Sequence, residues 1–311
     1  MRLITPLPSD SFQATREGAD WLTDWRGKAR GRTEELPLAW DRANPPQLAD
    51  AIWKSYKDVL HEAGGAKCMY CESPGELGAL QVDHYRPLRG NHKTLASCDR
   101  QSHTGYYWLA YKEENFVLTC QPCNRAKSNS FPIEGKRCYD REIGIEALDA
   151  VEMPLIVNPF YIRSGNDWRR TLLSWCDVMR LERRSGEWVP HDNYPQALSS
   201  LAEKALVTVK TLKLNRPGLR DQRRLRSAEA ANFALGEFGG ILKNEMSVMR
   251  SNREVAERQD LVRCLDLVWP SLLNYIGLKS SFSAAAVSYI EQELIALLDL
   301  PVVCEDRHVL A

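Results

Sequence analysis

Two short stretches decide the fold: CMYC at Cys68–Cys71 and CQPC at Cys120–Cys123. Each places two thiolates on one tight turn, and together they supply the four soft ligands that tetrahedral zinc prefers. The segment between them, residues 72–119, is longer than in an ordinary zinc ribbon, so we expect an insertion between the two halves. A redox-active pair is the alternative, but such a site needs only one Cys-x-x-Cys inside a βαβ pattern. We therefore predict one structural zinc ion per chain, held by Cys68, Cys71, Cys120 and Cys123.

A carboxylate and an imidazole lie side by side between the two cysteine pairs. The run VDHYRP (Val82–Pro87) places Asp83 beside His84 at the end of a predicted short strand. Because adjacent strand residues point to opposite sides, one side chain can hold a metal ion while the other faces a water molecule. The alternative is a partly buried histidine that is hydrogen-bonded to Asp83, and structural pairs of this kind also perturb titrating groups.

A second predicted strand leads into a helix. The apolar run NFVLTC (Asn115–Cys120) enters the second cysteine pair, Pro122 suits the first turn of a helix, and Pro132 stops that helix. The helix carries three polar side chains: Asn124, Arg125 and Lys127. Alone they would indicate a solvated helix start. Together with the neighbouring Asp–His pair inside a zinc-bound frame they indicate a catalytic site.

The same segments resemble a known nuclease motif. NFVLTCQPCNRAKSNSFP (Asn115–Pro132) resembles the corresponding stretch in the HNH domain of CRISPR effector nucleases, and VDHY (Val82–Tyr85) resembles that domain's first strand. In this ββα-metal motif a hairpin and a helix grip one catalytic metal ion. The resemblance implies that Asp83 binds the metal, His84 is the general base, Asn115 steadies the hairpin and Asn124 is a second metal ligand. The motif usually ends in His rather than Asn124, which leaves open which divalent ion is preferred.

The resemblance implies cleavage of phosphodiester bonds. A Mg²⁺ or Mn²⁺ ion on Asp83 and Asn124 would act as a Lewis acid. His84, with an ordinary pKa of about 6.5, would take a proton from the attacking water. Arg125 and Lys127 would hold flanking phosphates or spread transition-state charge. The expected products carry 5′-phosphate and 3′-hydroxyl ends, and the zinc replaces a core that so short a unit cannot build.

A wider resemblance runs patchily from about residue 66 to residue 226. GYYWLAYKEENFVLTCQPCN (Gly105–Asn124), LIVNPF (Leu155–Phe160) and TLKLNRPGL (Thr211–Leu219) look like the retron-associated and Septu-type HNH defence proteins. This resemblance implies an effector of a prokaryotic anti-phage system that cuts nucleic acid, with DNA as the expected substrate. It also implies an ATPase partner. The C-terminal helices would dock such an ATPase or a second copy of the chain, and completion of the core around the ββα unit is an equal alternative.

Two other function classes fit part of the sequence. A zinc-ribbon module that binds nucleic acid without cutting it needs the cysteines but not Asp83, His84 and Asn124. A structural adaptor would depend on the helical C-terminal region alone. The joint presence of the three polar side chains favours the nuclease.

The predicted fold class is α+β, with a zinc-stapled ββα core between mainly helical flanks. We predict an N-terminal helical region at 1–65, the nuclease core at 66–140 and a mainly helical region at 141–311. Within them, a helix is expected from Asn44-Pro45-Pro46 to Gly64-Gly65, and a hairpin turns at Ser185-Gly186. Three more helices are expected near residues 198–212, 261–272 and 290–298.

Bulk composition sets few limits. The 41 basic and 41 acidic side chains cancel, so attraction to nucleic acid must come from local patches. No signal-peptide pattern occupies Met1–Asp10 and no stretch is apolar enough for a membrane span. Nine cysteines without an export signal favour metal ligation over disulfides. We expect a cytoplasmic protein without a membrane partner.

Two further clusters each have two interpretations. Arg220, Arg223 and Arg224, with Arg216 and Arg226, can neutralise phosphates or form the solvated face of a helix. The run Tyr106-Tyr107-Trp108 can stack on bases, but packing against the hairpin is favoured.

Overall fold

The computed structural model describes residues 16–38, 41, 45–90, 104–159, 179–190 and 200–252, with 282, 285–286, 288–290 and 292 near the C-terminus. These residues combine helices with two small two-stranded sheets, so the expected α+β class is confirmed for this part of the chain. The helices and strands in chain order are α2 (Arg16–Glu34), α3 (Asp50–Ser55), α4 (Lys57–Ala63), β1 (Leu80–His84), β2 (Phe116–Cys120), α5 (Gln121–Lys127), α6 (Ile145–Glu152), β3 (Met179–Glu182), β4 (Glu187–Pro190), α8 (Ser200–Thr211) and α9 (Pro217–Asn252). Among the described helices, none has both the length and the apolar content that crossing a bilayer requires.

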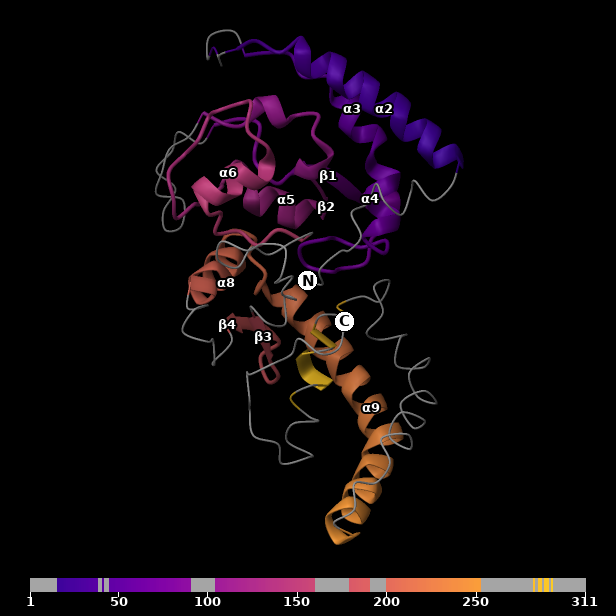
Figure 1. Cartoon of the computed structure of the whole chain (residues 1–311). Coiled ribbons are helices and arrows are strands. Elements are labelled where there is room, and N and C mark those ends of the chain that lie inside the picture. The colour runs from indigo at the N-terminus through magenta and orange to yellow at the C-terminus, as the bar shows by residue number, and fades with distance from the viewer. Residues whose placement is uncertain are drawn as a thin grey trace.

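Figure 1 shows β1, β2, α5 and α6 together, with α2, α3 and α4 beside them and α8, α9 and the β3–β4 hairpin below. Strands β1 and β2 are antiparallel, with Leu80 opposite Cys120 and His84 opposite Phe116. Apolar side chains at three successive positions of β2 are all buried, because the sheet is covered on both faces. Helix α5 starts directly after β2 with a proline in its first turn, where a backbone N–H would have no partner within the helix.

The N-terminal helices pack against this sheet through aromatic rings. The ring of Trp25 lies 4.6 Å from that of Tyr56 and 5.9 Å from that of Phe116, and its indole N–H donates to Ile52 O at 2.9 Å. The helix expected from residue 44 to 64 differs in two ways. It starts only at Asp50, and it is interrupted at Tyr56, which separates α3 from α4. Tyr56 and Leu60 are buried in the core, and Ile52 packs against it partly buried.

The C-terminal hairpin and helix are as the sequence predicted. Strands β3 and β4 are antiparallel around the turn at Ser185-Gly186, where Gly186 has φ +71°. A side chain there would also meet Arg220 O at 2.5 Å, so the turn needs glycine. The predicted helix near 198–212 corresponds to α8. The helices predicted near 261–272 and 290–298 lie outside the described residues, apart from positions 290 and 292.

Candidate functional site

The four predicted zinc cysteines lie together at one end of the β1–β2 sheet. Their sulfur atoms are all within 4.8 Å of one another, and the Cys71 and Cys120 sulfurs are 3.7 Å apart. Zn–S bonds of ~2.3 Å in a tetrahedron place sulfurs ~3.8 Å apart, so this cluster has the size of a zinc tetrathiolate. The donor set is all thiolate, and three of the four cysteines are buried. The residues therefore fit a structural zinc ion.

The knuckles are built by the local backbone. Cys68 N donates to Ser73 O at 3.0 Å and Glu72 N donates to Cys68 O at 2.8 Å, which closes the first turn. Glu72 takes φ +59°, a left-handed conformation that such a turn requires. Met69 N donates to Leu118 O at 2.8 Å, so the first knuckle is bonded to the strand that carries the second.

Asp83 and His84 point to opposite sides of β1, as their adjacency predicted. The Asp83 side chain faces α5, where its Oδ2 lies 3.1 Å from Lys127 Nζ. Burial raises the pKa of Asp83, and the charge of Lys127 partly opposes that rise. Oδ2 is buried and its contact with Lys127 is an ion pair without hydrogen-bond geometry.

The His84 ring is held on the other side of the strand. Its Nε2 lies 3.0 Å from Ala110 O, and the rings of Trp53 and Phe116 meet it edge-on at 5.0 and 5.4 Å. Burial lowers the pKa of His84 to about 4, so the imidazole is neutral at neutral pH. Because Ala110 O can only accept, the proton is on Nε2 and the lone pair is on Nδ1.

Both residues line one cleft at the end of β1, with a volume of about 470 Å³. Asn124 of α5 also lines it, and its amide nitrogen donates to Gln81 Oε1 at 2.9 Å. This bond connects α5 to β1 and leaves the amide oxygen of Asn124 available. The predicted residues that the structure brings to this cleft are Asp83, His84, Asn124 and Arg125.

Sequence reasoning missed several residues of the cleft. Arg89 is exposed on its rim, and within the described part of the chain neither Arg89 nor Arg125 forms an ion pair. The remaining polar lining comes from Gln81, Gln121, Ser128 and Asn129. Arg89 lies five residues after His84 and outside the VDHYRP motif, so its closeness to the site in the sequence was the one available signal.

Lys127 is placed differently from the sequence prediction. It is fully buried, and its ammonium donates to His84 O at 2.7 Å besides pairing with Asp83. A phosphate contact is not available to a side chain in this position. The cause is local, because the α5 face that carries position 127 packs onto β1.

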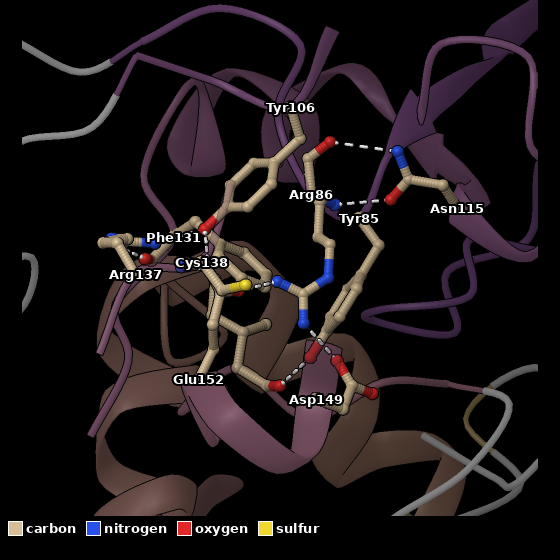
Figure 2. A network of polar contacts seen from close by, with 10 residues as sticks. Tyr85, Arg86, Tyr106, Asn115, Phe131, Arg137, Cys138, Asp149 and Glu152 are labelled. Carbon is tan, nitrogen blue, oxygen red and sulfur yellow. Dashed lines mark hydrogen bonds and ion pairs between the residues drawn. The ribbon is translucent and has the colours of Figure 1, made fainter. Parts of the chain in front are cut away.

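Asn115 and Arg86 fix the segment that follows His84, and Figure 2 shows their contacts. Asn115 is buried; its amide oxygen accepts from Arg86 N at 2.7 Å and its amide nitrogen donates to Arg86 O at 3.1 Å. The Arg86 guanidinium is fully buried between the rings of Tyr106 and Phe131, at 5.3 and 4.8 Å from their centres. It pairs with two carboxylates of α6, Asp149 and Glu152. The loop that follows His84 is therefore fixed to a helix beyond the predicted core boundary at residue 140.

The predicted arginine cluster is dispersed in the structure. Arg223 is fully buried and donates to Gly186 O and Leu214 O, both at 2.8 Å, so it cannot contact a phosphate. Arg220 pairs with Glu187 at 2.5 Å, and Arg224 is exposed. None of the three is among the described residues that line the cleft. The aromatic run at residues 106–108 is buried in the core, so these rings are not exposed for stacking on bases.

Comparisons with known proteins give local similarity. Over 108 residues the chain is 33% identical to Septu protein PtuB of Bacillus mycoides (strain KBAB4), covering 34% of this chain and 35% of PtuB. Over 70 residues it is 40% identical to Septu protein PtuA of the same strain, covering 22% of this chain and 9% of PtuA. The chain thus spans about a third of one relative and about a tenth of the other. None of the protein-family profiles matches the chain, and no solved structure matches it. The chain is homologous to Septu proteins over part of its length.

Proposed function

We propose that the protein is a metal-dependent endonuclease of the HNH type that hydrolyses phosphodiester bonds in nucleic acid. One observation carries the proposal: Asp83, His84 and Asn124 border the same cleft from a strand and the helix beside it. This set contains a carboxylate, a neutral imidazole and an amide oxygen, which are the groups that metal-assisted hydrolysis requires.

His84 acts as the general base. Its Nε2–H donates to the Ala110 carbonyl at 3.0 Å, which fixes the tautomer and leaves the Nδ1 lone pair to accept a proton from water. The edge-on rings of Trp53 and Phe116 restrict rotation of the imidazole. A base held in one orientation loses little freedom when the reaction occurs.

Asp83 and Asn124 would hold the catalytic divalent ion. The Asp83 carboxylate and the amide oxygen of Asn124 are both hard donors, which Mg²⁺ and Mn²⁺ prefer. When bound, the ion supplies Lewis-acid activation of the phosphate. Lys127 orients the Asp83 carboxylate from behind and favours its charged form.

Arg89 and Arg125 would bind the flanking phosphates. Both guanidinium groups are exposed on the rim of the cleft, and planar guanidinium groups match phosphate oxygens in a bidentate manner. With the chain's overall charge at zero, two cations at this rim provide the local attraction that a polyanion needs.

The local similarity to two Septu proteins supports a role in an anti-phage defence system. DNA is the substrate that we include in this proposal. We include a protein partner in this proposal, because an unrestrained nuclease would damage its host. Co-expression with neighbouring genes, followed by purification on a tagged copy of this chain, tests for that partner.

The experiment that tests the nuclease uses the full-length protein with plasmid, single-stranded DNA and RNA, in Mg²⁺, Mn²⁺ or EDTA. His84→Ala should abolish cleavage while zinc content and circular dichroism stay unchanged, since His84 is not a zinc ligand. His61→Ala is the matched control, because His61 lies on α4 and does not line the cleft. Full cleavage by His84→Ala would refute the assigned base.

The alternative is a zinc-ribbon protein that binds nucleic acid without cutting it. It requires the four cysteines and the rim cations, but neither the fixed tautomer of His84 nor the carboxylate of Asp83. This alternative would be favoured if the zinc-loaded protein bound nucleic acid without added Mg²⁺ or Mn²⁺ and cleaved none of the three substrates, either alone or in a partner complex.

A further inference from the structure

The turn between α8 and α9 places an arginine directly against the cysteine cluster. Arg216 Nη1 lies 3.5 Å from the Cys123 sulfur, and its Nη2 lies 3.7 Å from the Cys71 sulfur and 3.9 Å from the Cys120 sulfur. These are N–H···S distances, and one planar guanidinium makes all three. Arg216 is separated from Cys71 by 145 positions in the sequence, so this contact joins distant parts of the chain.

The charge of the cluster explains the contact. Four thiolates with one Zn²⁺ carry a net charge of −2, and three of these four cysteines are buried. Buried charge is costly unless a partner compensates it. Groups that donate hydrogen bonds to metal ligands fix their orientation and tune the metal. A half-buried guanidinium across three sulfurs meets both needs.

The turn that presents Arg216 is itself fixed to the β3–β4 hairpin. The side chain of Asn215 accepts from Trp188 N at 2.8 Å and donates to Trp188 O at 2.9 Å. Arg223 lies over the Trp188 ring at 5.4 Å and donates to Leu214 O at 2.8 Å. The hairpin, the turn and the start of α9 therefore behave as one unit, and Arg216 is the side chain of that unit that reaches the cysteines.

We infer that the zinc site is the joint at which this C-terminal unit is held on the nuclease core, with Arg216 as the positioning residue. Zinc binding and docking of the unit are coupled: the charged cluster binds Arg216, and Arg216 stabilises the charged cluster. Thermodynamic linkage makes this coupling reciprocal, so loss of either weakens the other. The inference rests on zinc occupancy of the cysteines, but not on the proposed cleavage.

The first test measures zinc in the full-length protein without reference to cleavage. Competition with a chromogenic chelator gives the zinc affinity of Arg216→Gln, Arg216→Lys and Arg226→Gln. Arg216→Gln should weaken zinc binding by roughly 10–100-fold, the effect typical of lost partners of metal ligands. Arg216→Lys keeps the positive charge but not the planar guanidinium that contacts three sulfurs, so an intermediate zinc affinity is expected. Arg226→Gln is the control, since Arg226 pairs with Glu229 on the exposed side of α9.

Two further readouts separate a charge effect from a merely structural one. In the Co²⁺-substituted protein, Arg216→Gln should shift the sulfur-to-cobalt charge-transfer band, because that band reports the electron density on sulfur. Removal of zinc from the wild-type protein should increase hydrogen exchange in residues 179–190 and 212–219. An Arg216→Gln protein with unchanged zinc affinity and an unchanged band would overturn the inference. If Arg216→Gln does not fold, wild-type zinc affinity in Arg216→Lys together with unchanged hydrogen exchange on zinc removal would do the same.

Discussion

Replacing Arg86 with methionine should lower the free energy of unfolding by about 3–5 kcal/mol, because it removes one partner of a buried ion cluster. The Arg86 side chain is 0% exposed, and its partners Asp149 and Glu152 are 6% and 0% exposed. Methionine fills a similar space between the rings of Tyr106 and Phe131, so the effect reports lost charge compensation rather than a cavity. The two carboxylates of α6 would remain buried without their cation (Figure 2).

Thermal and urea unfolding of the zinc-loaded protein measure this effect. A chain of this size loses roughly 2 °C of melting temperature per kcal/mol, so a decrease of about 6–10 °C is expected. Arg226→Met is the matched control. Its ion pair with Glu229 is exposed, at 40% and 47%, and pairs of this kind contribute at most about 1 kcal/mol.

A second variant tests the cause. Adding Glu152→Gln to Arg86→Met removes one of the unpaired buried charges, so the double variant should be more stable than Arg86→Met alone. Glu152→Gln in the wild-type background should instead be destabilising, and this change of sign is the signature of direct coupling. The reasoning is refuted if Arg86→Met has the same melting temperature as the Arg226→Met control. It is also refuted if Glu152→Gln destabilises the wild-type protein and the Arg86→Met variant equally.

Three further predictions concern the site. Purified protein should contain one zinc per chain, and Cys68→Ser or Cys123→Ser should lose it and misfold; elemental analysis that finds no zinc in well-folded protein would contradict this. Lys127→Met should reduce cleavage strongly, since it removes the partner of a buried carboxylate, and excess Mn²⁺ should restore part of it; cleavage at the wild-type rate would show that the ion pair is dispensable. Replacing Arg89 and Arg125 together by Gln should weaken binding to all sequences alike and reduce the slope of log affinity against log salt by about 2. An unchanged slope would show that the phosphate backbone of the nucleic acid binds elsewhere on the protein.

Local sequence patterns predicted the parts of the site that are held by neighbours in sequence. The Cys-x-x-Cys spacing fixes two thiolates per turn, and four cysteines in two such turns indicated a shared ion, which matches the sulfur cluster. The alternation that placed Asp83 and His84 on opposite sides of a strand follows from strand geometry alone. Both inferences depend only on the geometry of a few consecutive residues.

The sequence could not predict contacts between residues that are far apart in the chain. The pairing of Arg86 with Glu152 spans 66 positions, and no local pattern distinguishes a buried arginine from a surface one. Lys127 and Arg223 show the same difficulty, because each lies in a basic segment whose charge indicated solvent or phosphate. Their burial depends on which helix face meets the sheet or hairpin, and a two-turn helix such as α5 has too few residues to define that face.

The lengths of the elements explain why the cleft has supports at both ends. Strands β1 and β2 have five residues each, and an isolated two-stranded hairpin is marginally stable at best. At the end where Leu80 pairs with Cys120, the cysteine cluster fixes the hairpin and the start of α5, which carries Asn124. At the opposite end, Asn115 fixes the backbone after His84 through its two bonds to Arg86. The cysteine cluster therefore supports the helix that carries the proposed metal ligand Asn124, whereas Asn115 and Arg86 support the segment after the proposed base, His84. The distance between these two proposed site residues depends on both supports, so the candidate site requires structure well beyond the short segment that carries its motif.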